Sequence, residues 1–275
     1  MSNKKAWEDL TIADDYMFKL VMGYKRICIK LLEIILNIKI RDIREAETEK
    51  EIKQRYLSKG VRLDVFVEDD LGTMYDIEMQ VRKYPDEVLG RRTRYYQSMI
   101  DLSALNPSSR YDDLKKSIII FICPFKLFNS NRHKYTFNNI CQEDKSIVLD
   151  DGASKIFLST KGEIDDVSKE VKNFLKFVDG ISVKDDFVDE VKNLIDELKR
   201  TEKERANYMT FQMIMNEERE EGREEGRKEG MEKGMITALL SSVRNLMKNM
   251  GLSATEAMNA LSVSADKQKE LAPLI

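Results

Sequence analysis

The sequence is poor in the side chains that build disulfide frameworks, zinc sites and histidine-based chemistry. It holds three cysteines, Cys28, Cys123 and Cys141, which are too few and too widely spaced for a disulfide framework or a zinc site. Its single histidine, His133, lies in the polar stretch 129–135, and we expect it on a surface loop. Metal sites and general bases built on histidine are therefore largely excluded.

Long apolar runs and a strong excess of charge are also missing. No segment approaches the roughly 20 apolar residues that a membrane-spanning helix needs, and residues 1–15 lack the apolar run of a signal peptide. With the scattered cysteines, this favours a reduced, cytoplasmic setting and no membrane partner. The net charge is −3 and the pI about 5.6, so any surface that binds nucleic acid has to be local.

The length and composition predict one large domain with an appendage. The chain has 275 residues, of which 42% are hydrophobic and 35% charged. The first figure supports a sizeable core, and the second is raised by the C-terminal third. We expect a folded domain over 1–200, a charged helix or linker with periodic glycines over 201–236, and a small helical module over 237–275.

The most informative stretch is 61–82, in which apolar and polar residues alternate in two runs. One predicted face carries Val61, Leu63, Val65, Val67, Tyr75, Ile77, Met79 and Val81, and the other carries Arg62, Asp64, Phe66, Asp76, Glu78, Gln80 and Arg82. Period-two alternation is typical of half-buried strands. Residues 69–72, Asp-Asp-Leu-Gly, have the composition of a turn. We therefore predict a β-hairpin.

The hairpin brings carboxylates together. A turn centred near Leu71 sets Asp64 opposite Glu78, because each lies seven residues from it. Directly opposed side chains in an antiparallel pair are about 4.5–5.5 Å apart at Cβ, and Gln80 follows on the same face. Mg²⁺ prefers oxygen ligands of this kind, usually one or two carboxylates plus water.

A solvated sheet face explains the same residues without a metal. Antiparallel sheets often expose one side to water and fill it with polar side chains. The alternation alone slightly favours this interpretation, whereas Phe66 on the polar face argues mildly against it.

The other segments alternate between helical and strand-like patterns. Helices are predicted near the N-terminus, over 26–37, from Pro85 onwards and over 164–215, and a short edge strand within 38–57. The continuous apolar run 117–124 is typical of a central buried strand. Shorter strands are expected at 135–140 and 155–159.

The helix after the hairpin carries an apolar stripe and a group of arginines. The predicted stripe consists of Val88, Tyr95, Met99 and Leu102, flanked by Arg91, Arg92 and Arg94. Two interpretations stay open for the arginines. They form a solvated helix face, or they contact nucleic-acid phosphates, for which the guanidinium fork is well suited.

The C-terminal third is charged and periodic. Glycines recur every four residues at Gly222, Gly226, Gly230 and Gly234, among Glu and Arg/Lys residues at spacings that pair on a helix. Each costs a helix roughly 1 kcal/mol relative to alanine, so the row indicates either a close helix–helix contact or a weak solvated linker. Ser253 and Glu256 match a capping box, which predicts a further short helix. For 217–235 we expect a linker or a self-association helix, with no catalytic role. The short helices over 236–275 are similar to helix-turn-helix modules, but this segment is not basic, so partner binding or dimerisation is an equally good interpretation.

Six segments in order carry a resemblance to a known family. They are DDYMFK at 14–19, VRLDVFVED at 61–69, YDIEMQ at 75–80, RRTRYYQ at 91–97, IFICPF at 120–125 and DGASKIFLSTKG at 151–162. The chain resembles the PD-(D/E)XK nuclease family transposases, which are related to the recombination-promoting nucleases. The resemblance implies an α/β, restriction-endonuclease-like core over 1–200, with a mixed central sheet flanked by helices, and a helical C-terminal extension.

The resemblance also implies an activity and a site. The expected function is that of a Mg²⁺-dependent (or Mn²⁺-dependent) endodeoxyribonuclease of the recombination-promoting or transposase type. Asp64 and Glu78 would hold the metal, and Gln80 stands where the motif usually has lysine. Asp15 maps to an accessory acidic position in the first helix.

The helix that follows the hairpin packs beside the site in folds of this kind. The resemblance therefore makes Arg91, Arg94 and Gln97 candidates for DNA contact. The alternative is a catalytically weak or inactive module of the same fold that binds DNA or protein and self-associates through residues 217–275.

Overall fold

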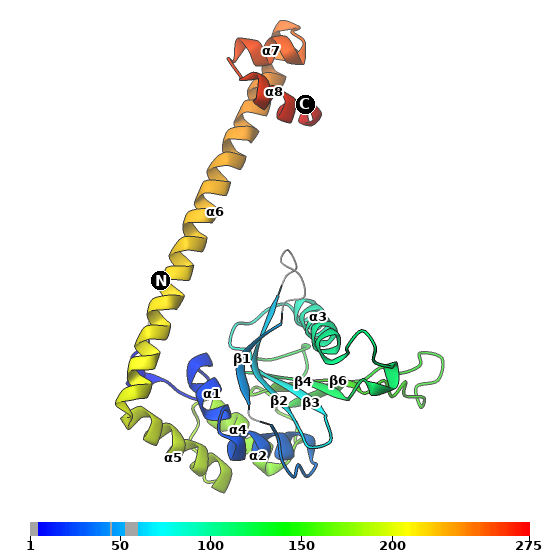
Figure 1. Cartoon of the computed structure of the whole chain (residues 1–275), viewed down its shortest axis with the longest axis vertical. Coiled ribbons are helices and arrows are strands. Elements are labelled where there is room, and N and C mark those ends of the chain that lie inside the picture. The colour runs from blue at the N-terminus through cyan, green and yellow to red at the C-terminus, as the bar shows by residue number, and fades with distance from the viewer. Residues whose placement is uncertain (1–4, 45, 53–59) are drawn as a thin grey trace. The chain divides into compact units, whose positions relative to one another are not determined.

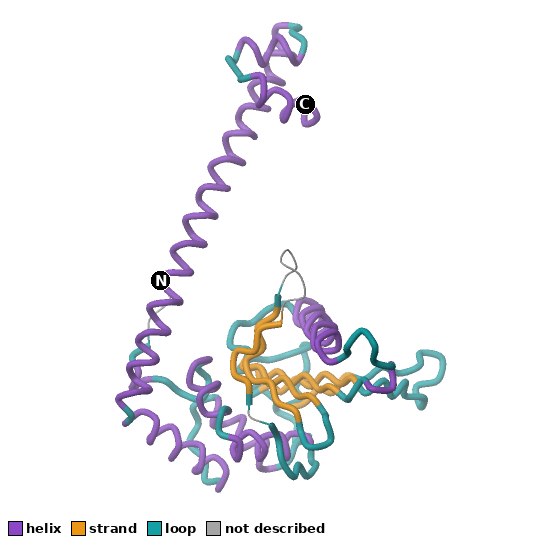
Figure 2. The backbone as a smooth tube through the Cα atoms, viewed as in Figure 1, coloured by secondary structure: helices purple, strands orange, loops and turns teal. Residues whose placement is uncertain are grey.

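The structure is a computed structural model that describes residues 5–44, 46–52 and 60–275. The chain divides into two compact units, Met1–Arg205 and Ala206–Ile275. The first unit contains all the strands, and the second is helical (Figures 1 and 2). The unit boundary at Arg205 lies close to the domain end expected at residue 200.

The first unit is built on one mixed six-stranded sheet with the order β1-β2-β3-β4-β6-β5. The strands are β1 (Glu47–Ile52), β2 (Val61–Glu68), β3 (Met74–Met79), β4 (Ser117–Cys123), β5 (Lys134–Phe137) and β6 (Ala153–Ser159). β3, β4 and β6 run parallel, and the remaining pairs are antiparallel. This confirms the expected α/β fold with a mixed sheet. β1 is one of the two edge strands, and residues 45 and 53–57 of the segment expected to hold an edge strand lie outside the described residues.

Helices cover both faces of the sheet (Figure 1). α3 (Asp86–Ala104) packs on one face, against β1 and β4. The other face carries α1 (Asp15–Met22), α2 (Lys25–Leu36) and α4 (Lys169–Val178), and α5 (Asp186–Arg200) packs against α1 and α4. α4 and α5 each begin at a side chain that accepts backbone N–H groups, Ser168 and Asp185 respectively. Such caps satisfy donors that the first helical turn leaves unpaired.

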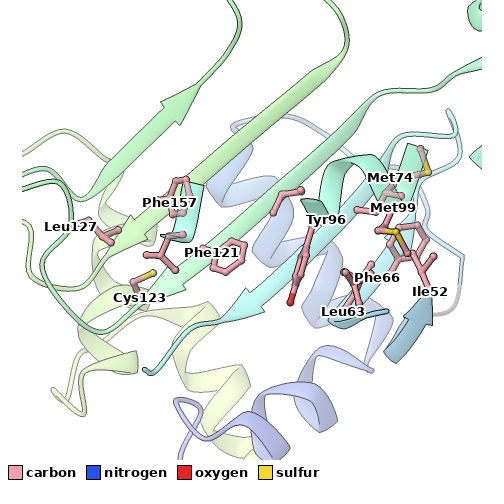
Figure 3. Close-up of a cluster of buried hydrophobic side chains, with 14 residues drawn as sticks. Ile52, Leu63, Phe66, Met74, Tyr96, Met99, Phe121, Cys123, Leu127 and Phe157 are labelled. Carbon is pink, nitrogen blue, oxygen red and sulfur yellow. The ribbon is translucent and has the colours of Figure 1, made fainter. Parts of the chain in front are cut away.

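The core beneath α3 is a continuous cluster of apolar side chains (Figure 3). Phe121 of β4 lies at its centre, with its ring centroid 5.6 Å from that of Phe157 and 6.3 Å from that of Tyr96. β4 is flanked by strands on both sides and covered on both faces, which is why its sequence is apolar from Ile118 to Cys123. The central buried strand expected at 117–124 is confirmed.

The hairpin of β2 and β3 is present, and its turn is closed by one carboxylate. Asp69 Oδ1 accepts the N–H groups of Leu71 and Thr73, and its Oδ2 accepts the hydroxyl of Tyr75 at 2.7 Å. Gly72 adopts φ 83°, a region that glycine enters without steric cost. The predicted turn residues therefore act as expected.

The predicted division of the hairpin into a dry and a wet face is wrong. Every residue of β3 is buried, because α3 covers the face that was expected to be solvated. Leu63 and Phe66, expected on opposite faces, belong to one core cluster. The alternation of β2 breaks between them, opposite Glu49, where the β1–β2 ladder is interrupted and the backbone adopts φ 61°.

Two further predictions are corrected. In α3 the buried face includes Leu89, Tyr96 and Ile100, together with the expected Met99, whereas the other three predicted stripe residues are partly exposed. The stripe was misplaced because the sheet, not the helix pattern, selects the covered face. His133 is buried at 5% exposure, with its ring against Gly162 and Nδ1 3.1 Å from the carbonyl of Ser159.

The second unit contains most of the long helix α6 (Glu202–Met250), followed by α7 (Ala254–Ala260) and α8 (Ala265–Leu271). Its small core is formed by Val243, Ala257, Met258 and Leu271. The predicted capping box at Ser253 and Glu256 is present. In the part of the chain that the structure describes, no helix combines the length and apolarity needed to cross a membrane.

The four periodic glycines lie in α6 without close neighbours. A Cβ added at any of them would meet nothing within 4 Å. One interpretation of the glycine row is a close helix–helix contact. The described residues of this chain do not make that contact, so it would need another molecule.

Candidate active site

The site lies where β2 and β3 part. Their regular pairing ends at Val65 and Ile77, so the next opposed residues are Asp64 and Glu78, as the predicted register requires. Beyond that point the two strands are linked by hydrogen bonds from backbone N–H groups to side-chain carboxylates, in place of backbone–backbone hydrogen bonds. The N–H of Asp64 donates to Glu78 Oε1 at 3.0 Å, and the N–H of Met79 donates to Asp64 Oδ2 at 3.2 Å. The two carboxylates thus occupy the fork between the diverging strands.

Asp64 faces a buried ammonium group from α1. Lys19 Nζ lies 3.3 Å from Asp64 Oδ1, 2.8 Å from Asp15 Oδ2 and 3.1 Å from Glu49 Oε1. The lysine side chain is only 7% exposed. Burial lowers its pKa, but the surrounding carboxylates outweigh that effect, so the pKa is raised above its ordinary value and the group is cationic. Three segments, α1, β1 and β2, therefore converge on one positive charge.

Glu78 faces a cation from the opposite helix. Arg92 of α3 donates through Nη2 to Glu78 Oε2 at 2.7 Å and also to the hydroxyl of Tyr96. Its Nη1 donates to Gln80 Oε1, and the amide nitrogen of Gln80 donates to the carbonyl of Arg82. The oxygen and the nitrogen of the Gln80 amide are thus both hydrogen-bonded.

Burial raises the pKa values of the acidic groups. Desolvation, together with the charge of Asp15, raises the pKa of Asp64, and Lys19 opposes this. Desolvation and the charge of Asp64 raise the pKa of Glu78 to about 8, although Arg92 favours the ionised form. Such shifts are common at functional sites, where charged groups are gathered away from water.

Asp76 is a third acid beside this pair. It is fully buried, and burial and the nearby charge of Glu78 raise its pKa well above the ordinary value. Among the described residues, no N–H or hydroxyl group donates to either of its carboxyl oxygens, and its polar neighbour is the carboxyl of Glu78. A buried carboxylate to which no group donates is strongly unfavourable, which is the physical reason that the pKa of Asp76 is raised.

The other candidates occupy different settings. Asp15 is the first residue of α1 and bonds to Lys19. Arg91 and Arg94 are exposed on α3. Gln97 is buried at 7% exposure, and its amide donates to Ser117 Oγ and, at 3.1 Å, to Asp101 Oδ1.

Sequence reasoning missed four residues at this site, namely Lys19, Glu49, Asp76 and Arg92. Lys19 could have been found from its i, i+4 spacing to Asp15, and Asp76 from its place two residues before Glu78. For Arg92 the sequence leaves a solvated helix face and contact with nucleic-acid phosphates open, and it does not indicate the contacts with Glu78 and Gln80. Nothing in the sequence singled out Glu49, because its position depends on an irregular backbone angle.

The donor set suits a hard divalent cation. Asp64 and Glu78 offer only oxygen, and Mg²⁺ is usually bound through one or two carboxylates while it keeps several waters. Across residues 5–44, 46–52 and 60–275, no group of three or more acidic, histidine or cysteine side chains is arranged to hold a metal. Asp64 and Glu78 are therefore the two residues of this fork that could hold such an ion.

The mixed sheet with an acidic pair at its forked hairpin is an arrangement of the nuclease-like α/β class. A family model described as PD-(D/E)XK nuclease family transposase matches residues 12–232. The chain belongs to this family, which confirms the resemblance drawn from its motifs and supports a nuclease-like function. No curated protein and no solved structure matches the chain.

Proposed function

We propose that the chain is a metal-dependent DNA endonuclease of the recombination-promoting or transposase-like type. The observation that carries this proposal is the reciprocal arrangement of Asp64 and Glu78, each of which accepts a backbone N–H from the strand of the other. These bonds hold two carboxylates at one fork, in a chain of a nuclease family. The proposed reaction is hydrolysis of a phosphodiester bond.

Asp64 and Glu78 would hold Mg²⁺ or Mn²⁺. The ion, when bound, supplies Lewis acidity and lowers the pKa of a water molecule. Arg92 keeps Glu78 in place through its charged hydrogen bond. Gln80, in turn, orients Arg92 by accepting from its second nitrogen. In this proposal Gln80 acts as a positioning residue, because an amide brings a dipole but no charge.

DNA would be held along α3. Arg91 and Arg94 are exposed, and no ion pair involving either is formed among the described residues. Their guanidinium groups are therefore available for phosphate oxygens. Gln97 lies inside and ties α3 to the first residue of β4. We propose that it supports the helix, and that the two arginines contact the backbone of DNA.

The test is nicking of supercoiled plasmid with and without Mg²⁺ or Mn²⁺. Wild type is compared with Asp64→Asn and Glu78→Gln, and with Asp112→Asn as a matched control on an exposed acid. We expect metal-dependent nicking that falls at least about 100-fold in both site variants, as for loss of a metal ligand or its support, and persists in the control. Cleavage without metal, or full activity in Asp64→Asn, would contradict the proposal.

A second candidate function is binding without turnover. It is favoured by the fact that both carboxylates already have an internal cation, Lys19 on Asp64 and Arg92 on Glu78. In this case the chain binds DNA or protein and assembles through residues 217–275. Mobility shifts without cleavage, and a sedimentation mass that drops when residues 217–275 are removed, would support it. An unchanged oligomeric mass would exclude that mode of assembly.

A further inference from the structure

We propose that Lys19 is a catalytic residue of this nuclease, whose ammonium group contacts the phosphate under attack. The inference rests on the proposed function. It starts from the position of the ammonium group, which lies 3.3 Å from Asp64 and within 3.1 Å of both Asp15 and Glu49. Phosphodiester hydrolysis builds negative charge at the phosphoryl oxygens, and a fixed cation there stabilises the transition state.

The packing of α1 fixes the position of the Lys19 backbone and restricts its side chain. Its neighbours Phe18 and Val21 are fully buried, and α1 packs on β1 and β2. Few rotamers are open to a lysine side chain with 7% exposure. Its charge is therefore directed to the fork and not to bulk water, which is the arrangement that electrostatic catalysis requires.

The other polar groups at the fork are already committed. Gln80 uses both ends of its amide, on Arg92 and on the carbonyl of Arg82. Arg92 is shared by Glu78, Gln80 and Tyr96. Lys19 is also paired, with three carboxylates, but its ammonium group has three donors and can exchange one carboxylate for a phosphate oxygen.

The step balances without a further reactant. The oxygen of water forms a bond to phosphorus, the bond from phosphorus to the leaving ester oxygen breaks, and the proton lost by the water is matched by one gained by the leaving oxygen from solvent. Lys19 keeps its proton throughout and donates a hydrogen bond to a phosphoryl oxygen. It therefore touches the reacting group without taking part in proton transfer.

A purely structural role makes different predictions. If Lys19 only neutralises buried carboxylates, its loss disorders the fork, and metal binding fails together with cleavage. If it acts on the phosphate, its loss slows cleavage while metal and DNA binding persist. An ammonium group supplied from a neighbouring position would then restore part of the rate.

The experiment uses the full chain with Lys19→Met, the double variant Lys19→Met/Gln80→Lys, and Lys172→Met as a control on a lysine of α4 that pairs with Asp165. Single-turnover cleavage, DNA affinity and calorimetric Mg²⁺ binding are measured. We expect Lys19→Met to slow cleavage about 100-fold or more, with DNA and Mg²⁺ dissociation constants within about threefold of wild type or tighter. The double variant should regain at least about tenfold, and the control should match wild type.

Three results would overturn the inference, namely cleavage at the wild-type rate by Lys19→Met, loss of Mg²⁺ binding in a folded variant, or no recovery in the double variant. If Lys19→Met does not fold, Lys19→Gln, which keeps a polar group of similar length, is compared with wild type in the same three measurements. If neither variant folds, the residue is structural and the proposal is refuted. If wild type does not cleave, the proposed function fails and this inference with it. If wild type cleaves DNA and Lys19→Met cleaves at the same rate, this inference is refuted but the proposed function is not.

Discussion

The buried position of Glu78 makes the stability of the metal-free protein fall as pH rises. Burial raises the pKa of Glu78 from 4.5 to about 8. Over most of the pH range between these two values, Glu78 is protonated in the native state and ionised in the unfolded chain. Stability therefore decreases with pH wherever the native state binds more protons. The contribution is fully present below pH 4.5 and is lost as pH passes through 8.

The magnitude follows from the two pKa values. A shift of this size corresponds to about 5 kcal/mol of stability at low pH. Between pH 6 and pH 9 most of what remains of the contribution of Glu78 is lost, on the order of 3 kcal/mol. A glutamine at this position does not titrate, so the slope of stability against pH is smaller in Glu78→Gln. Asp76 contributes in the same direction, because burial and, after it, the charge of Glu78 raise its pKa.

The assay is urea unfolding in EDTA at pH 6, 7, 8 and 9, followed by tryptophan fluorescence. The only tryptophan, Trp7, is buried in the first unit, and its ring nitrogen donates to the carbonyl of Lys199, so it reports on the unit that holds the site. Groups that titrate alike in both proteins cancel in the difference between wild type and Glu78→Gln. Parallel curves for the two proteins over this range would refute the reasoning.

The same experiment with Mg²⁺ connects stability to the proposed site. A cation that binds the ionised carboxylates stabilises the native state by mass action. At pH 9 we expect Mg²⁺ to raise the unfolding free energy of wild type and to have little effect on Glu78→Gln. At pH 6 protons compete for Glu78, so the effect on wild type is smaller. Equal stabilisation of both proteins would place the ion elsewhere.

Three further predictions concern the framework of the site, each measured by urea unfolding against wild type. Phe121→Ala should lose about 3–5 kcal/mol, because it empties the centre of the cluster under α3; a loss below about 1 kcal/mol would mean that the cluster refills. Gly162→Ala should lose about 1–3 kcal/mol, since the new Cβ would lie 2.4 Å from the ring of His133, and unchanged stability would contradict that contact. Gly90→Ala, in α3 with nothing within 4 Å, should gain about 1 kcal/mol; a loss would show that this position is crowded.

Much of the fold could be predicted because its signals are local. The hairpin followed from alternation on both sides of a turn that Asp69 closes through its own side chain. The central strand followed from an apolar run long enough for β4 but too short for a typical helix. These features depend on neighbours within a few residues, so the sequence was sufficient to find them.

The distribution of buried faces could not be predicted in the same way. β3 alternates polar and apolar residues and yet is buried on both sides, because α3 was placed over the face expected to meet water. Leu63 and Phe66 share one cluster because the ladder is interrupted near Glu49. Burial is a property of the assembled layers, and a strand's own pattern does not record which helix covers it.

The sequence by itself determined the opposition of Asp64 and Glu78, since the turn sets the register and the register sets which residues face each other. Only the tertiary structure decided what surrounds them. Lys19 reaches Asp64 from α1, and Arg92 reaches Glu78 from α3. The physical reason is that charges separated in the chain interact strongly only after packing has removed the water between them, and that packing is set by the whole sheet and both helical layers.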